Sequence, residues 1–185
     1  MRIQRVTALL VVALILPVSA SFASPAPAPD PTLANLSALR GPAFDVAFLR
    51  AAVPDDDEAV ELAMTATLYA DHADLLRWNQ DFAEREHAQI REMLALLGEF
   101  GTGPTERKEG VATASVKKLR ALRGPALERT YIALMTRHFD RSMALAKLAA
   151  QRADRPALRT FATNAAAVDR QDEGTLRGWL ARWYH

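Results

Sequence analysis

The chain has 185 residues, 50% of them hydrophobic, so it can bury one ordinary core but is too short for two large independent domains. Its 23 Lys and Arg residues nearly balance its 22 Asp and Glu residues, which argues against a nucleic acid or an anionic membrane surface as a partner. The absence of cysteine excludes disulfides and thiolate metal ligands, so stability must come from packing or from a bound ligand.

The first residues are typical of a secretory signal peptide. Arg2 and Arg5 precede an apolar run at residues 8–18, and small residues follow around Ala23. This run is short for a membrane span, and the chain has no cysteine that could carry a lipid anchor. We therefore expect residues 1–23 to be removed and the mature protein to be secreted or periplasmic, without a membrane span.

A proline-rich segment follows, with proline at every second position from residue 25 to residue 31. Proline fixes φ and removes backbone donors, so we assign residues 24–37 to an extended tether. The folded domain is then expected to occupy residues 38–183.

The chain contains an internal repeat. The hexapeptide Ala-Leu-Arg-Gly-Pro-Ala at residues 38–43 recurs letter for letter at residues 121–126, an offset of 83 positions (121 against 38). The same offset pairs Leu62 with Leu145 and Leu97 with Leu180. This pattern indicates two copies of one unit.

Each unit is predicted to form a helical hairpin. Apolar residues follow each Gly-Pro pair at alternating three- and four-residue steps, with turns expected near residues 71–74 and 153–156. Pro54 should kink the first helix or make it restart there. No strand signal is present. We therefore predict an all-α four-helix bundle, with one hairpin at 38–97, a crossover loop at 98–115 and a second hairpin at 116–183.

Polar residues interrupt both apolar stripes. Asp55 takes the place of an apolar residue in the first copy, and His138 takes the equivalent place in the second. In antiparallel hairpins Glu86 lies level with Asp55, and Asp169 and Asp172 lie level with His138. Approximate two-fold packing would bring all of these side chains into one layer of the bundle.

Such a layer needs compensation, because burying charged groups unpaired costs several kcal/mol each. A divalent metal ion is one solution, and the candidate ligands are Asp55, Glu86, His138, Asp169 and Asp172. This oxygen-rich set with one nitrogen suits zinc, manganese or iron better than copper(I). In the alternative interpretation water fills the layer and an arginine neutralises the acids, the candidates being Arg50, Arg85, Arg137 and Arg141.

Other polar residues are given simpler roles. We interpret Asp56, Asp57 and Glu58 as first-turn acids favoured by the helix dipole, and we place His72 in an exposed turn. The sequence has no phosphate-binding glycine loop, nucleophile elbow or His-Glu-x-x-His motif, so we expect no enzymatic activity.

Two segments, at residues 44–63 and 157–183, resemble the domain of unknown function 305 (DUF305) family. The family pattern has Phe-Asp, then Met-Ile-Pro-His-His-Gln, and a second helix with Gln-x-x-Glu. The resemblance covers about residues 39 to 183. It implies a secreted or periplasmic ferritin-like helical bundle, often of two tandem hairpins, with copper bound in some members.

This chain departs from the family pattern at the metal-binding positions. Where the family has His-His, the first copy has Asp55 followed by Asp56, and the second has His138 followed by Phe139. The resemblance therefore implies the fold but not an intact copper site.

Two hypotheses remain after this comparison. One is a metal-associated bundle that holds zinc, manganese, iron or copper in a repurposed carboxylate and histidine layer. The other is a metal-free envelope protein that binds another protein or itself.

Overall fold

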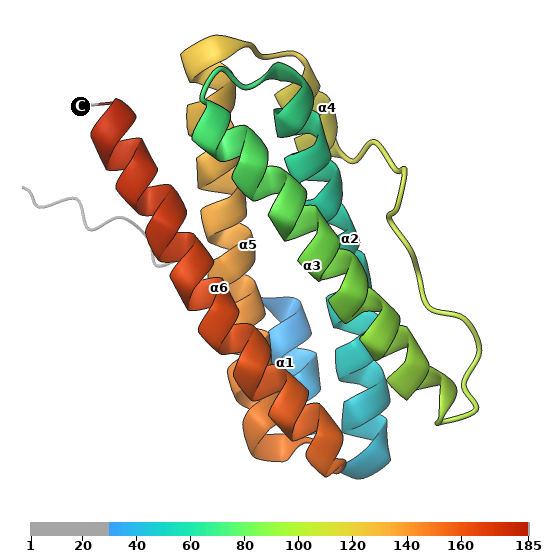
Figure 1. Cartoon of the computed structure of the whole chain (residues 1–185). Coiled ribbons are helices and arrows are strands. Elements are labelled where there is room, and N and C mark those ends of the chain that lie inside the picture. Colours follow the sequence, from blue (N-terminus) through green and yellow to red (C-terminus); the bar gives the residue numbers. More distant parts are fainter. Residues whose placement is uncertain (1–29, 185) are drawn as a thin grey trace, which may run out of the picture.

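The structure, a computed structural model, describes residues 30–184, and this part of the chain contains helices and no strand. Four long helices form a bundle of two hairpins (Figure 1): α2 (Gly41–Tyr69), α3 (Ala73–Gly98), α5 (Gly124–Arg152) and α6 (Pro156–Trp183). Two short helices accompany them, α1 (Pro31–Ala38) and α4 (Ala114–Arg120). The predicted all-α four-helix bundle is confirmed. The expected signal peptide lies outside the described residues.

The two hairpins meet through their first helices. Helix α2 packs along α3, α5 packs along α6, and α2 packs against α5. Helices α1 and α4 both rest on α2 and α5. None of the described helices is long and apolar enough to cross a membrane.

Helices α2 and α5 begin in the same way, at the two copies of the Gly-Pro pair. Gly41 and Gly124 have φ values of 59° and 54°, in the left-handed region where a side chain would be strained. The proline after each glycine fits the first helical turn. Both helices have 29 residues, and their first residues are 83 positions apart (124 against 41).

Helix α1 departs from the sequence analysis, which assigned residues 24–37 to an extended tether. The Asp30 side chain caps this helix by accepting a hydrogen bond from the Thr32 amide at 2.7 Å, and Pro31 occupies its first turn. Leu36, which is 2% exposed, packs it onto the bundle core. Proline starts a helix here because an Asp cap precedes it and an apolar contact follows.

Of the two alternatives predicted for Pro54, a kink or a restart of the helix, the restart is wrong, because α2 is continuous from Gly41 to Tyr69. Pro54 removes one backbone hydrogen bond from the helix. Val53 is fully buried and Ala59 is 1% exposed, so core packing on both sides of Pro54 offsets that loss. The acidic residues 55–58 therefore lie in the middle of a helix and not in its first turn.

The hydrophobic core consists of two clusters. One includes Phe44 of α2 and Leu158 of α6, and the other includes Leu75 of α3 and Leu127 of α5. On α5 and α6, polar residues lie between the stretches that supply the two clusters, and on α2 and α3 the buried acids Asp56 and Glu86 lie within a few residues of the point where the clusters adjoin. A polar layer therefore separates the two halves of the core.

Each hairpin turn is bound to the opposite hairpin by one fully buried acid. Asp45 of α2 accepts hydrogen bonds from two backbone amides just before α6, at 2.8 and 3.0 Å. Glu128 of α5 accepts hydrogen bonds from two backbone amides just before α3, at 2.7 and 2.9 Å. These acids satisfy amides that have no partner within their own helices, and they hold the two hairpins together.

The Glu128 carboxylate also binds side chains at the same end of the bundle. It lies 2.6 Å from Nδ1 of His72 and accepts a hydrogen bond from the Tyr184 hydroxyl. The His72 ring stacks on Trp183 at a centroid distance of 3.8 Å. His72, which we placed in an exposed turn, is therefore part of a contact between the first hairpin and the end of α6.

We expect Asp45→Ala to lower the free energy of unfolding by about 3 kcal/mol, because it leaves two amides without their acceptor. Asp81→Ala, on the exposed face of α3, should change it by less than about 0.5 kcal/mol. Urea unfolding followed by circular dichroism measures both variants. Equal stability of the two variants would contradict a capping role for Asp45.

Candidate functional site

The polar layer surrounds a small cavity between the long helices. Its volume is about 20 Å³, which leaves room for about one water molecule or ion. Apolar walls are formed by residues such as Phe48, Met93 and Phe161. The polar side chains that line it are Asp55, Asp56, Glu86, Gln89, Ser142 and Asp169.

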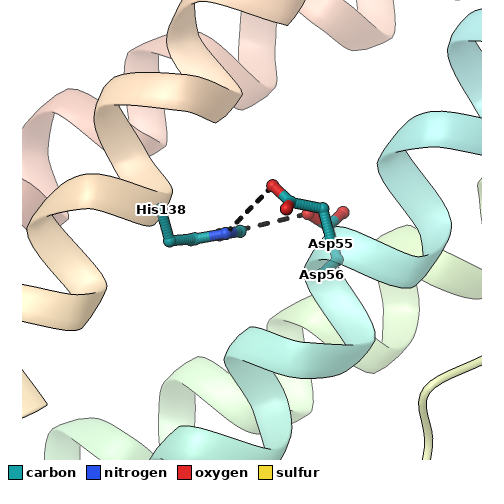
Figure 2. A group of neighbouring side chains, drawn as sticks. All are labelled: Asp55, Asp56 and His138. Carbon is teal, nitrogen blue, oxygen red and sulfur yellow. Dashed lines mark ion pairs between the residues drawn. The ribbon is translucent and has the colours of Figure 1, made fainter. Parts of the chain in front are cut away.

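Asp55, Asp56 and His138 form a compact cluster at one side of this layer (Figure 2). Each offers one nitrogen or oxygen atom, and these atoms lie within 4.8 Å of one another. Nδ1 of His138 is 3.4 Å from Oδ2 of Asp55, and Nε2 is 4.0 Å from Oδ1 of Asp56. The predicted pairing of Asp55 on α2 with His138 on α5 is present in the structure.

Asp56 joins the cluster although we interpreted it as a first-turn acid. That interpretation is wrong because α2 begins at Gly41, so residue 56 lies in mid-helix, where its side chain is 12% exposed. Asp55 and Asp56 are consecutive, and both reach His138 from the same turn of the helix. The consecutive His-His of the family pattern was the signal that could have identified Asp56.

Asp57 and Glu58 have a different role, which is to hold the crossover segment on α2. Asp57 accepts two hydrogen bonds from Arg107, at 2.8 and 3.0 Å, and one from the Lys108 amide at 2.8 Å. Glu58 accepts hydrogen bonds from Nζ of Lys108 and Oγ1 of Thr113, both at 3.0 Å. These two acids are therefore structural rather than part of the cavity lining.

Glu86 and Asp169 are the most deeply buried acids of the layer, at 3% and 4% exposure. Glu86 accepts a hydrogen bond of 2.9 Å from Nε2 of Gln89. Oδ2 of Asp169 is buried and has no hydrogen-bond partner among the described residues. Both acids, predicted from the sequence as ligands, line the cavity.

Asp172, the fifth predicted ligand, does not line the cavity. It accepts hydrogen bonds from Nη2 of Arg85 at 2.6 Å and from Nε1 of Trp78 at 3.3 Å. Its charge is thus compensated by one of the arginines that the sequence analysis named as alternatives to a metal. The structure brings Asp55, Glu86, His138 and Asp169 together with Asp56, and it places Asp172 in a neighbouring ion pair.

Arginine compensates only the edges of the layer. Arg141 pairs with Asp55, and Arg85 pairs with Asp172. Among the described residues, no lysine or arginine lies within 4.0 Å of the carboxylates of Asp56, Glu86 or Asp169. The imidazole of His138 is therefore the cationic group that acts most strongly on these three buried acids.

This imbalance shifts the pKa values of the layer. Burial raises the pKa of Asp56 well above its usual value, and the neighbouring Glu86 adds to the effect. Burial also raises the pKa of Asp169, and it raises that of Glu86 to about 7. These carboxyl groups bind protons more readily than they would in water.

The pKa values of Asp55 and His138 shift in the directions expected of an ion pair: that of the acid falls and that of the base rises. Burial opposes the charge on His138, but the hydrogen bond and charge of Asp55 outweigh it and raise the pKa of His138 to about 9. Burial likewise opposes the charge on Asp55, but His138 and Arg141 hold its pKa below the usual value. At neutral pH the protein without a metal therefore carries a protonated His138.

For the metal-free protein we expect the free energy of unfolding to fall by on the order of 2 kcal/mol as pH rises from about 5 to 9. The pKa of Glu86 is about 7 in the folded protein, against an ordinary value of 4.5. The stability that protonated Glu86 contributes is therefore lost as pH rises through 7. The contribution of His138 is complete below pH 6.5 and is lost as pH rises through 9.

Glu86→Gln should make the free energy of unfolding nearly independent of pH below about pH 7, and it should leave the loss of stability above pH 7 unchanged. Glu92→Gln, an exposed change on the same helix, should leave the whole curve as in the wild type. Urea unfolding in a chelating buffer at several pH values provides the measurement. A wild-type stability that is constant or rises with pH would contradict the expectation.

Comparison with known proteins identifies the same kind of bundle. Residues 100–180 match the family described as Domain of unknown function (DUF305). CopM in the Cu(I)-bound form superposes with a TM-score of 0.68 at 18% identity, over 76% of this chain and 98% of that chain. A comparison with curated proteins found no match.

Two solved DUF305 structures are similar to this chain as well. A DUF305 fragment from Deinococcus radiodurans has a TM-score of 0.67 at 24% identity, covering 75% of this chain and 95% of that one. A DUF305 protein from Streptomyces coelicolor has a TM-score of 0.67 at 23% identity, covering 75% and 91%. The resemblance predicted from the sequence is therefore confirmed: residues 100–180 match the DUF305 family, and the chain shares the fold of solved DUF305 structures.

Proposed function

We propose that this protein is a secreted or periplasmic helical bundle that binds a divalent metal ion in its polar layer. The observation that carries the proposal is the shortage of cations around Asp56, Glu86 and Asp169. These three acids lie around or beside a cavity that has room for one ion. A metal ion would compensate them and would satisfy the unpartnered Oδ2 atom of Asp169.

Asp55, Asp56 and His138 are the residues that would hold the ion. The buried Oδ2 atom of Asp55 lies 3.4 Å from Nδ1 of His138. Because the three donor atoms lie within 4.8 Å of one another, small side-chain movements could bring them around one ion. Glu86 and Asp169 would complete the set from the cavity side, directly or through water.

The donor set favours zinc, manganese or iron. Carboxylate oxygens and one imidazole suit these ions, whereas copper(I) and silver prefer thiolate or thioether sulfur. CopM, which shares the fold, has structures in Cu- and Ag-bound forms. In this chain Asp55 and Asp56 stand where the family pattern has His-His, so we infer a harder ion than copper(I).

The location and the role of the protein are also proposals. Secretion or export to the periplasm rests on the signal-like pattern of residues 1–23. We infer a binding role rather than a catalytic one, because the buried acids Asp56, Glu86 and Asp169 line a cavity of about 20 Å³, too small for an organic substrate.

A metal-free module that binds another protein or itself is the alternative. The ion pairs of Arg141 with Asp55 and of Arg85 with Asp172 favour it, since they neutralise part of the layer without a metal. A groove of about 580 Å³, lined by residues of α3 and α6, offers a surface for such a partner. A measurement of metal binding distinguishes this alternative from the proposed metal-binding function.

We expect saturating Zn²⁺ to raise the melting temperature of the mature protein by roughly 5 °C or more relative to a chelating buffer. His138→Ala should abolish this shift because it removes the only nitrogen donor of the cluster. His87→Ala, a change outside the cavity lining, should preserve it. Identical melting temperatures with zinc and with chelator, together with no metal in the purified protein, would refute the proposal.

We also expect the affinity for Zn²⁺ to increase with pH between about 6 and 8, by about tenfold per pH unit for each proton released. The ion must replace the proton on His138, whose pKa is about 9, and those on the buried carboxyl groups. Calorimetric titration in two buffers of different ionisation enthalpy counts the protons released. An affinity independent of pH would contradict binding at His138.

A further inference from the structure

Arg141 connects the polar layer to the N-terminal helix. Its Nη1 atom donates to Oδ1 of Asp55. Its Nε donates to Oδ2 of Asp30 at 2.8 Å, and its Nη2 donates to Oγ1 of Thr32 at 3.1 Å. One guanidinium group therefore bridges a candidate metal ligand and the first turn of α1.

Arg141 also lies in the groove on one side of the layer. Asp55, His138 and Arg141 all line a groove of about 340 Å³ that α2, α4 and α5 form. The Arg141 side chain is 34% exposed, whereas those of His138 and Asp55 are 8% and 14% exposed. The guanidinium thus lies at the more exposed end of the cluster.

Arg141 supplies much of the polar attachment of α1. Helix α1 has only eight residues, too few to be stable alone, so it depends on its contacts with the bundle. Leu36 packs into the core, and Arg152 donates to the Ser37 carbonyl at 2.6 Å near the end of the helix. At its first turn the side-chain hydrogen bonds to the bundle join Arg141 to Asp30 and Thr32, while Leu33 packs against the core.

We propose that Arg141 is an internal counter-cation that competes with the metal ion for Asp55, and that metal binding consequently loosens α1. This inference rests on the proposed function. Without a metal, the guanidinium neutralises Asp55. A divalent ion beside Asp55 supplies that charge instead and repels the guanidinium, since like charges at this separation interact strongly at a partly buried site.

The effect of Arg141 on metal binding and the effect of metal binding on the Arg141 contact are linked by thermodynamics. If the Arg141 contact with Asp55 weakens metal binding, then metal binding must weaken that contact to the same extent. Weakening it removes one end of the bridge to Asp30 and Thr32, so α1 loses an attachment. Metal binding in the layer would thus make α1 less tightly attached to the bundle.

Calorimetric titration with Zn²⁺ tests the competition. We expect Arg141→Gln to bind zinc about tenfold more tightly than the wild type. Arg141→Lys, which keeps the charge, should bind within about threefold of the wild type. Arg137→Gln is the matched control, because Arg137 is exposed, lines the same groove and makes no ion pair in the described part of the chain, so its affinity should change by less than about twofold.

Two titration results would overturn the inference in distinguishable ways. Zinc binding by the wild type with equal or weaker binding by Arg141→Gln would refute the competition and leave the proposed function standing. No zinc binding by any of the proteins would refute the proposed function and this inference with it.

Hydrogen exchange measures the link to α1 without relying on the titration. In the metal-free protein, Asp55→Asn should speed exchange of the α1 amides by about threefold or more, although residue 55 lies outside α1. Zinc should have the same effect on the wild type, while amides of α6 near Leu176 stay unchanged. Unaltered α1 exchange in metal-free Asp55→Asn would overturn the coupling, whether or not zinc binds.

Discussion

The burial of several carboxyl groups in one layer is the constraint on which the rest of this structure depends. Hydrophobic clusters lie on both sides of the layer, so water can compensate its innermost acids, Glu86 and Asp169, only within a cavity of about 20 Å³. A buried charge without a partner costs several kcal/mol, which is comparable to the stability of a whole domain. The fold therefore has to supply cations, protons or a bound ion at this level.

The structure distributes that compensation unevenly. Arg141 and Arg85 serve the acids at the edges, Asp55 and Asp172, and the centre is left to His138 and to protons. Raised pKa values at Glu86 and Asp169 mean that these carboxyl groups bind protons more readily in the metal-free layer than in water. A metal ion would take the place of those protons, so metal binding and protonation are two answers to one electrostatic problem.

The sequence predicts the bundle and the meeting of Asp55 with His138, because helical periodicity and the offset of 83 both act through regular geometry. It did not predict Asp56 as a neighbour of His138, since a continuous helix through Pro54 depends on tertiary packing. The cap formed by Asp45 was also missed, because its partners lie in the other hairpin, more than 100 positions away. Local patterns identify helices, but they do not identify contacts between hairpins.

The two hairpins differ in charge at positions where they meet. Asp55 and Glu58 of α2 are acidic, whereas His138 and Arg141, each 83 positions later on α5, are basic. Because α2 packs against α5, this difference lets one helix neutralise part of the other. Two identical histidine motifs, one on each helix, would offer nitrogen ligands from both sides. Here the acidic residues of α2 face the basic residues of α5, and the centre of the layer keeps its carboxylates. In the proposed metal site, carboxylates in place of histidines favour a harder ion than copper(I).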